Sequence, residues 1–292
     1  MTKEGIILKG IGGFYYVKAD DFQLYECKAK GIFRNEGIKP LTGDRVTISV
    51  NENAENTIDV IHERSTVMTR PPIANIDRLF IVQSTVEPRP VLLIIDKLTA
   101  LAVDKGIEPI VIFTKCDKAN GQRYADIYRR VNIKSICVSC KTGEGIDEVK
   151  NEVEGYISAF AGNTGVGKSS LLNALEPSLN LATDEISDAL GRGKHTTRQS
   201  ELFEICGGLV ADTPGFASIV SEDSEFVSKE NLPFAFKEFA PYLGQCRFST
   251  CRHMNDMGCK IIEAVEMGEI PVSRHESYKM LLEQAEQVKS WN

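Results

Sequence analysis

One segment constrains the fold of this chain more than any other: residues 162–169 read G-N-T-G-V-G-K-S. The segment matches the pattern G-x-x-x-x-G-K-[ST], and it lies between the apolar run at residues 156–161 and the helix-like run at residues 170–175. In such a strand–loop–helix setting, the glycines let successive backbone N–H groups point at phosphate oxygens near a helix N-terminus. The sequence therefore predicts a phosphate-binding loop in an α/β domain, the alternative being a glycine-rich turn before a surface helix.

The chemistry of this loop assigns a role to its last residues. Lys168 is expected to reach the β- and γ-phosphates of a nucleoside triphosphate, and Ser169 is expected to ligate Mg²⁺. The full set of expected phosphate-binding residues is Gly162, Asn163, Thr164, Gly165, Val166, Gly167, Lys168, Ser169 and Ser170.

A second motif indicates which base is bound. Thr114, Lys115 and Asp117 follow the apolar run at residues 110–113 and stand in the place of the guanine-reading pattern N-K-x-D, with Thr instead of the usual Asn. An Asp carboxylate can accept both N–H groups on the edge of guanine, and adenine cannot make that pair. The motif therefore predicts GTP.

A third motif agrees with the second. Ser139, Cys140 and Lys141 follow the apolar run at residues 136–138 and resemble the S-A-K loop, which offers a backbone N–H to guanine O6. Each of these short motifs alone also fits a solvated turn. Their occurrence at two predicted strand ends, in one chain with a phosphate loop, predicts a GTP site.

Two further loops are expected to respond to the γ-phosphate. Asp212 and Gly215 belong to a D-x-x-G motif directly after the apolar run at residues 209–211. Asp212 is expected to hold Mg²⁺ through water, and the backbone N–H of Gly215 to sense the γ-phosphate. The polar loop before this strand contains Thr196 and Thr197, one of which is expected to ligate Mg²⁺; a plain flexible loop is the alternative.

The order of these motifs is unusual. In ordinary GTPases the phosphate loop comes first and the two base-reading loops come last, whereas here residues 114–117 and 139–141 precede residues 162–169. Because chain ends in compact domains often lie close together, the same sheet can form from a circularly permuted chain. The D-x-x-G loop then leads directly into the C-terminal segment.

That C-terminal segment carries a metal-binding pattern. Cys246, Cys251, His253 and Cys259 have the spacing C-x₄-C-x-H-x₅-C. Three thiolates and one imidazole complete a closed tetrahedral Zn²⁺ shell with no vacant position for catalysis. The pattern predicts a structural zinc site in a short helical domain, and scattered buried cysteines are the alternative.

The N-terminal region has a different character. About five short predicted strands, including residues 14–17, 23–27, 31–34, 43–50 and 57–61, are separated by turn residues. This pattern suggests a small β-barrel, and it fits an OB-type barrel and another small β-domain equally well. The sequence thus predicts three domains. They are a barrel at residues 1–66, a circularly permuted α/β P-loop GTPase domain at residues 67–222, and a helical zinc domain at residues 223–292.

Composition excludes several classes of protein. The net charge of −7 excludes binding to nucleic acid by bulk positive charge. No apolar run approaches the roughly 18 residues that a membrane span needs, and residues 1–30 do not read as a secretory signal. Eight cysteines without an export signal favour metal binding or free thiols over disulfides. We therefore expect a cytoplasmic protein without a disulfide framework, and we expect it to be a monomer because nothing in the chain demands a dimer.

A predicted barrel, a permuted GTPase domain and the C-x₄-C-x-H-x₅-C segment together resemble the ribosome-small-subunit-dependent GTPase A family. The resemblance covers essentially the whole chain, and the segments G-R-G-K-H-T-T-R and D-T-P-G-F are among its more specific features. It implies a bacterial ribosome-assembly factor with an OB-fold. Such a protein binds the small ribosomal subunit and its rRNA late in maturation, and the subunit stimulates its slow GTP hydrolysis.

The resemblance also bears on catalysis. Phe216 stands where many GTPases place the Gln that orients the attacking water, so turnover of the isolated protein is expected to be slow. The family implies that the histidine of the first switch loop, here His195, serves instead. The residues expected to act in hydrolysis are Lys168, His195, Thr197 and Gly215. The rival interpretations are a metabolic P-loop ATPase or kinase, and an RNA-binding adaptor in which nucleotide is only structural.

Overall fold

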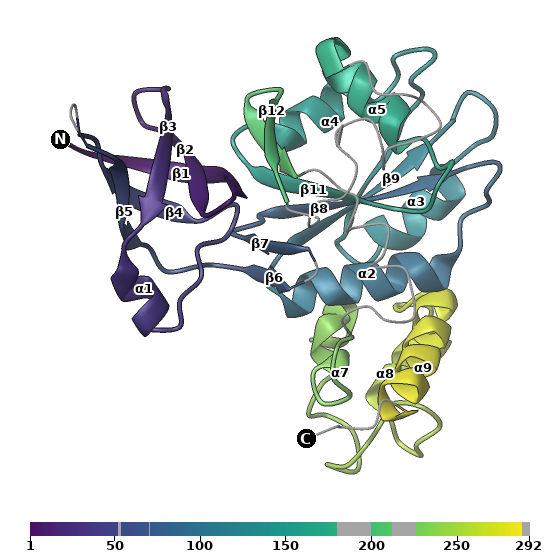
Figure 1. Ribbon diagram of the computed structural model, residues 1–292. Helices are drawn as coiled ribbons and strands as arrows, with labels where there is room; N and C mark the ends of the chain where they lie inside the picture. Colours follow the sequence, from purple (N-terminus) through teal and green to yellow (C-terminus); the bar gives the residue numbers. More distant parts are fainter. Residues whose placement is uncertain (52–53, 70, 180–199, 212–225, 288–292) are drawn as a thin grey trace.

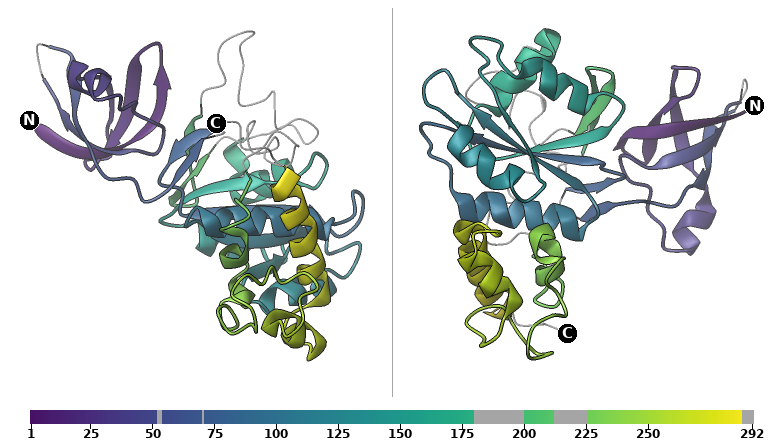
Figure 2. Two further views of the ribbon diagram at one scale, coloured as in Figure 1. Left: turned by 90° about the horizontal axis from the view of Figure 1, so that it is seen from below. Right: turned by 180° about the vertical axis from the view of Figure 1, so that it is seen from behind.

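The computed structural model in Figure 1 describes residues 1–51, 54–69, 71–179, 200–211 and 226–287. Its three parts are a β-barrel, an α/β unit and a helical unit packed beneath the α/β sheet in the view of Figure 1. The two further views in Figure 2 show the barrel beside the α/β unit and the helices against the side of that unit formed by α2. The expected fold class, an N-terminal barrel followed by an α/β domain and a helical domain, is confirmed.

The N-terminal part is a closed barrel with the strand order β1-β2-β3-β5-β4. Its strands are β1 (Thr2–Ile11), β2 (Phe14–Ala19), β3 (Leu24–Ala29), β4 (Arg45–Ser49) and β5 (Asn56–Ile61). Closure leaves no strand with an unpaired edge, and the interior is filled by small and branched apolar side chains. The fully buried ones include Ile7, Val17, Val46, Ile48 and Ile58.

Two details of the barrel differ from expectation. Residues 31–34 were expected to form a strand, but Gly31–Asn35 form the short helix α1, from which Phe33 packs into the barrel core. A short apolar run fits a strand and a buried helical turn equally well. The missing fifth strand is β1 at the N-terminus, whose residues lack a clean alternation of buried and exposed positions.

The α/β unit is built on a six-stranded sheet with the order β10-β9-β8-β11-β13-β12. The first five strands are parallel, and β12 pairs antiparallel with β13 at one edge. The strands are β8 (Arg78–Ser84), β9 (Glu108–Thr114), β10 (Lys134–Cys137), β11 (Ile157–Ala161), β12 (Leu202–Ile205) and β13 (Gly208–Ala211). A hairpin of β6 (Val67–Thr69) and β7 (Pro72–Ala74) connects the barrel to this sheet.

Both faces of the sheet are buried, because alternate strand residues point to opposite sides. In β8, Leu79 and Ile81 join one apolar core, whereas Phe80 and Val82 join the other. Helices α2 (Leu92–Asp104) and α3 (Gln122–Arg129) cover the first face, and α4 (Ile146–Val153) and α5 (Lys168–Leu175) cover the second. The strands therefore read as continuous apolar runs, as parallel sheets do.

Chain order and spatial order disagree in this sheet. The strand β11 lies between β8 and β13, although β8, β9 and β10 all precede it in the chain. The carboxyl ends of the parallel strands nevertheless share one edge, which brings the loops after β9, β10 and β11 to the same side of the sheet. The permuted order expected from the motifs thus yields a sheet with a single edge for the site.

The described helices of the helical part are α7 (Leu232–Ala235), α8 (Lys260–Glu266) and α9 (Val272–Gln287), and a short 3₁₀ turn at Lys237–Phe239 follows α7. A second 3₁₀ turn, at Pro177–Leu179, follows α5 in the α/β unit. Helices α7 and α9 pack on α2. A buried ion pair secures this contact, since Arg274 of α9 donates to Asp96 of α2 at 2.7 Å and to Glu238 at 2.7 Å. Among the described residues, no helix has the length and apolar character needed to cross a bilayer.

Polar contacts also join the barrel to the α/β unit at the antiparallel edge strand. The Thr42 hydroxyl donates to the carbonyl of Ser200 at 2.8 Å, and both side chains are buried. Lys9 of β1 pairs with Glu201 at 2.8 Å. The barrel is therefore attached to the residues that immediately precede β12 as well as through the connecting hairpin.

Candidate functional site

The phosphate-type loop follows β11 and opens α5, as the sequence predicts. Gly162 adopts φ +152°, and a Cβ at this position would lie 2.3 Å from the carbonyl oxygen of Val82 in β8. Gly165 and Gly167 also have positive φ values, +79° and +100°. Glycine is the residue that adopts such backbone conformations at little cost. The pattern of glycines is thus required by the close approach of the loop to β8 and by its turns.

The lysine of this loop is buried and turned back onto the loop. Lys168 Nζ donates to the carbonyl oxygens of Gly162 at 2.5 Å and Asn163 at 2.7 Å. Burial lowers the pKa of Lys168 to about 8. Ser169 is buried next to it at the first turn of α5, while Thr164 and Gly165 are exposed on the outside of the loop. An amine held by two carbonyls at a helix N-terminus can turn to a phosphate oxygen when one is present.

Thr114 ties the end of β9 to the phosphate loop. Its hydroxyl donates to the carbonyl oxygen of Val166 at 2.5 Å, and its side chain is buried. This contact performs a tethering function even though threonine stands where the pattern usually has asparagine. The buried Val166 is therefore fixed from both sides, by the strand behind it and by the apolar core beneath the loop.

Lys115 forms a second link between the loops. It adopts φ +60°, and its Nζ donates to the carbonyl oxygens of Gly165 at 2.8 Å and Glu87 at 2.7 Å. Glu87 lies in the loop after β8, and Thr85 of the same loop donates to the carbonyls of Thr114 and Lys115. The loop after β8 thus supports the site. Sequence reasoning missed it, although its position after a parallel strand between β9 and β11 was the available signal.

Asp117 is oriented by the loop after β10. Its Oδ1 accepts a hydrogen bond from the Ser139 hydroxyl at 2.9 Å, and the same hydroxyl accepts the backbone N–H of Thr142 at 3.2 Å. Ser139 is fully buried, whereas Asp117 is exposed. A carboxylate oxygen held by one donor keeps further lone pairs for a ligand. Cys140 is half-buried and Lys141 exposed in the same loop.

The structure therefore brings the three motifs after β9, β10 and β11 to one edge of the sheet and links them by hydrogen bonds. The remaining expected site residues fall outside the described part of the chain. These residues are His195, Thr196, Thr197, Asp212 and Gly215. The strand β13, which ends at Ala211 directly before Asp212, lies next to β11 in the sheet.

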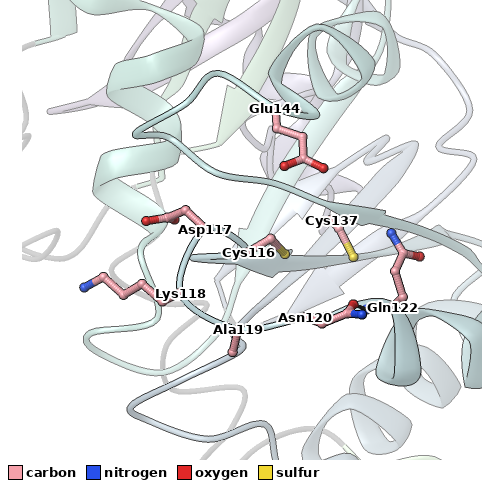
Figure 3. Close-up of a pocket in the computed structure, with 9 residues that line it drawn as sticks. Cys116, Asp117, Lys118, Ala119, Asn120, Gln122, Cys137 and Glu144 are labelled. Carbon is pink, nitrogen blue, oxygen red and sulfur yellow. Dashed lines mark hydrogen bonds between the residues drawn. The ribbon is translucent and has the colours of Figure 1, made fainter.

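A separate pocket of about 400 Å³ opens beside the base-reading loop (Figure 3). Cys116 and Asp117 contribute to its lining from the loop after β9, and Cys137 and Glu144 contribute from β10 and the loop that follows. The phosphate loop supplies none of the residues that line it. This pocket therefore shares Asp117 with the base-reading motif and does not extend to the phosphate loop.

The four residues of the metal pattern converge in the helical part. Their ligand atoms all lie within 4.8 Å of one another. His253 Nδ1 lies 3.4 Å from the sulfurs of Cys251 and Cys259 and 3.6 Å from that of Cys246, and the sulfurs of Cys246 and Cys259 are 3.9 Å apart. Tetrahedral zinc, with Zn–S about 2.3 Å and Zn–N about 2.0–2.1 Å, requires sulfur–nitrogen separations of about 3.5 Å and sulfur–sulfur separations of about 3.8 Å. The cluster is consistent with zinc.

Neighbouring side chains hold this cluster in place. His253 adopts φ +59°, and its carbonyl oxygen lies 2.6 Å from Nε2 of His275 in α9. Tyr278 of α9 donates to the carbonyl of Arg252 at 3.0 Å. Burial lowers the pKa of His253, so its imidazole is neutral and Nδ1 can act as a ligand. The last helix thus contacts the ligand loop on one side and α2 on the other.

The barrel, the permuted sheet and the three linked loops define a circularly permuted GTPase with an N-terminal barrel. A family model described as the RsgA GTPase matches residues 61–221, and one described as the RsgA N-terminal domain matches residues 4–58. The chain belongs to the RsgA GTPase family, and it is a GTP hydrolase.

Individual relatives match over nearly the whole chain. The small ribosomal subunit biogenesis GTPase RsgA of Geobacillus sp. (strain WCH70) is 42% identical over 98% of both chains, and that of Moorella thermoacetica is 41% identical over 96% of both. The crystal structure of YjeQ from Thermotoga maritima superposes with a TM-score of 0.84 at 32% identity, covering 98% of this chain and 99% of that one. YloQ, described as a circularly permuted GTPase, gives a TM-score of 0.81 at 31% identity, covering 98% and 96%.

Proposed function

We propose that this GTPase binds the small ribosomal subunit and its rRNA, hydrolyses GTP when the subunit stimulates it, and thereby assists late maturation of the subunit. The observation that carries the proposal is the whole-chain match to relatives named as small ribosomal subunit biogenesis GTPases. The three linked loops at one sheet edge support the proposal, because they place groups suited to a guanine base beside groups suited to phosphates. The protein acts as a cytoplasmic monomer.

Recognition of the base rests on Asp117 and Ser139. The carboxylate of Asp117, oriented by the Ser139 hydroxyl, accepts two N–H groups of guanine, while the Lys115 stem covers the ring. Replacing Asp117 by Asn substitutes an amide donor for one acceptor oxygen. Since a hydrogen bond to a charged group is worth about 1.5–3 kcal/mol, GTP affinity should fall about 100-fold.

The measurement for this step is nucleotide binding by D117N with GTP and ATP. The matched control is Asp147→Asn, which alters an exposed aspartate in the first turn of α4 whose carboxylate pairs with Lys150. Asp147→Asn should bind GTP like the parent protein. Unchanged GTP binding in Asp117→Asn, or a preference of the parent protein for ATP, would favour a metabolic ATPase or kinase instead.

Binding of the phosphates rests on the loop after β11. Its backbone N–H groups and the Lys168 ammonium face the phosphate oxygens, and the amine exchanges its two carbonyl partners for them. Ser169, with Thr196 or Thr197 and with Asp212 through water, would hold Mg²⁺, which supplies positive charge opposite the β- and γ-phosphates. The backbone N–H of Gly215 senses the γ-phosphate. The buried position of Ser169 beside Lys168 supports this assignment.

Hydrolysis requires a group that orients water, and Phe216 cannot supply one because its side chain has no hydrogen-bonding atom. We assign this role to His195, placed by docking on the subunit. A neutral imidazole can accept a proton near pH 7. The test is His195→Ala, in which subunit-stimulated turnover should be lost while subunit binding remains. Unchanged stimulated turnover with intact binding would refute the assignment.

The helical domain links nucleotide state to subunit binding. It follows the D-x-x-G segment in the chain and packs on α2 through a buried ion pair, and its Cys/His cluster would hold a structural Zn²⁺ that supports the ligand loop. GTP is then expected to favour the subunit-binding arrangement, and GDP to favour release. Equal subunit affinity in the presence of GDP and of a non-hydrolysable GTP analogue would contradict this coupling.

The decisive measurement is steady-state GTP hydrolysis by the purified protein alone and with small subunits, large subunits or naked RNA. Strong stimulation by small subunits only is the expected result. No turnover under any condition would favour an RNA-binding adaptor with a structural nucleotide. Turnover that is indifferent to every ribosomal particle would retain the GTPase but remove its proposed partner.

A further inference from the structure

Two thiols share the pocket beside the base-reading loop. Cys116 lies between Lys115 and Asp117, and Cys137 is the last residue of β10. Figure 3 shows both side chains on the same side of the loop, with their sulfurs turned into the pocket. Both residues are half-buried, so the pocket gives small solutes access to them. The GTPase mechanism described above uses neither thiol.

Parallel pairing of β9 with β10 brings the two cysteines together. Phe113 is the register partner of Cys137, and the backbone N–H of Cys116 donates to the carbonyl of Val138 at 3.1 Å. Gly121 packs against both thiols, since a Cβ on this residue would lie 3.1 Å from each of the two sulfurs. The backbone around the two cysteines is thus already joined by hydrogen bonds, and the same glycine lies against both sulfurs.

The two thiols differ in acidity. Interaction with the neighbouring thiol of Cys116 lowers the pKa of Cys137, and the charge of Arg129 lowers it further. The same interaction and burial raise the pKa of Cys116. A thiolate is the nucleophilic form of cysteine. Cys137 is therefore the thiol that reacts first, and Cys116 is the neighbouring thiol positioned to react with the product.

We propose that Cys116 and Cys137 form a reversible disulfide on exposure to a peroxide, and that this disulfide regulates nucleotide binding at the adjacent base-reading loop. In the first step the Cys137 thiolate attacks one peroxide oxygen, the O–O bond breaks, and the released hydroxide takes a proton to become water. In the second step the Cys116 sulfur attacks the resulting sulfenic acid and expels a second water. Two thiols and one hydrogen peroxide thus yield one disulfide and two waters.

The disulfide affects the site through the backbone of the loop. The Cys116 thiol now donates to the carbonyl of Phe113 at 3.2 Å, and bonding to Cys137 removes that contact. Asp117, the next residue, loses the position in which the Ser139 hydroxyl orients its carboxylate. This step rests on the proposed role of Asp117 in reading guanine. Disturbing one charge-assisted contact should reduce GDP affinity about tenfold.

Other thiols of the chain respond differently. Burial raises the pKa of Cys27 to about 11 and also raises the pKa of Cys206, so both remain protonated and unreactive. The thiols of the Cys/His cluster are metal ligands in the proposed function, and their oxidation would release zinc. Zinc release therefore serves as an independent signal that separates damage to the helical domain from the reaction at Cys137.

The experiment treats the zinc-loaded full-length protein with hydrogen peroxide at one equivalent per chain. Remaining thiols are alkylated, disulfides are mapped by mass spectrometry, and GDP affinity is measured before oxidation, after oxidation and after dithiothreitol. We expect a peptide pair linked through Cys116 and Cys137, a tenfold loss of GDP affinity, recovery on reduction, and no zinc release. Cys137→Ser should bind GDP like the parent protein and lose the response, while the matched control Cys206→Ser should keep it.

The outcomes separate this inference from the proposed function. Peroxide treatment that leaves Cys116 and Cys137 reduced, or a linked pair with unchanged GDP affinity, overturns the inference. Loss of affinity in Cys137→Ser as large as in the parent protein also overturns it. Failure of the reduced protein to bind guanine nucleotides would instead contradict the proposed function, whatever the state of the two thiols.

Discussion

The buried ion pair between the helical and α/β domains offers a strong test of how this protein is held together. Arg274 is fully buried, and its guanidinium donates to Asp96 and Glu238, each at 2.7 Å. The substitution Arg274→Met keeps most of the apolar volume and removes the charge. It leaves two carboxylates without their cation, one of them only 1% exposed.

Removing one partner of a buried ion pair costs about 3–5 kcal/mol, because the remaining charge is neither hydrated nor neutralised. For a protein of this size that loss corresponds to a decrease in Tm on the order of 10 °C. The measurement is thermal unfolding followed by circular dichroism. The matched control is Lys150→Met, which removes an exposed pair with Asp147 and should change Tm very little.

The effect should depend on pH with a defined sign. Burial raises the pKa of Asp96 even with Arg274 beside it, and loss of the guanidinium raises that pKa further. A carboxyl whose pKa is higher in the folded state stabilises the fold at low pH and loses that contribution as pH rises through the folded-state pKa. The Tm deficit of Arg274→Met should therefore be smaller at pH 5 than at pH 8.

A combined variant completes this test. Adding Asp96→Asn and Glu238→Gln to Arg274→Met removes the stranded charges and should restore part of the lost stability. A deficit that is equal at pH 5 and pH 8, together with no recovery in the combined variant, would show that the loss arises from packing and not from unpaired charge.

Three further outcomes follow from the sites. Cys251→Ser, or removal of metal with a chelator, should lower Tm and the content of bound zinc together, measured by thermal unfolding and elemental analysis; unchanged Tm after complete metal loss would refute a structural role. Gly162→Ala should abolish GTP binding, because its Cβ would lie 2.3 Å from the Val82 carbonyl at φ +152°, and calorimetry would detect any binding that remains. GTP affinity should decrease as pH rises above about 8, since the pKa of the buried Lys168 is lowered to about 8 and phosphate binding requires its protonated form; an affinity that stays constant to pH 9.5 would contradict this.

The sequence predicted the parts of this protein whose chemistry is local. The phosphate loop, the Cys/His cluster and the buried strands each leave a pattern of residue types within a short stretch of the chain, so a motif can record them. The first barrel strand was missed because its residues lack a clean alternation of buried and exposed positions. Helix α1 was misjudged because a short apolar run fits more than one local structure.

The supporting contacts of the site lay beyond sequence reasoning for a different reason. Lys115 donates to the backbone carbonyls of Gly165 and Glu87. Every residue has such a carbonyl, so residue types do not indicate which carbonyls accept these hydrogen bonds. The pairing of Cys116 with Cys137 likewise depends on the register of β9 against β10, which no spacing along the chain reveals. The register of the strands and the packing of the loops, and not residue identity, determine these contacts.

The permuted strand order has a consequence for synthesis of the chain. On the ribosome that makes this protein, β8, β9 and β10 emerge well before β11, which pairs with β8 by the register Phe160 to Phe80. Until then the inner edge of β8 carries unpaired backbone groups along an apolar strand, the kind of edge that recruits strands from other chains. The nascent protein therefore passes through a stage at which half of its sheet, the half that carries the base-reading loops, is open to association. A chain stalled or truncated in this interval should aggregate where the finished one does not.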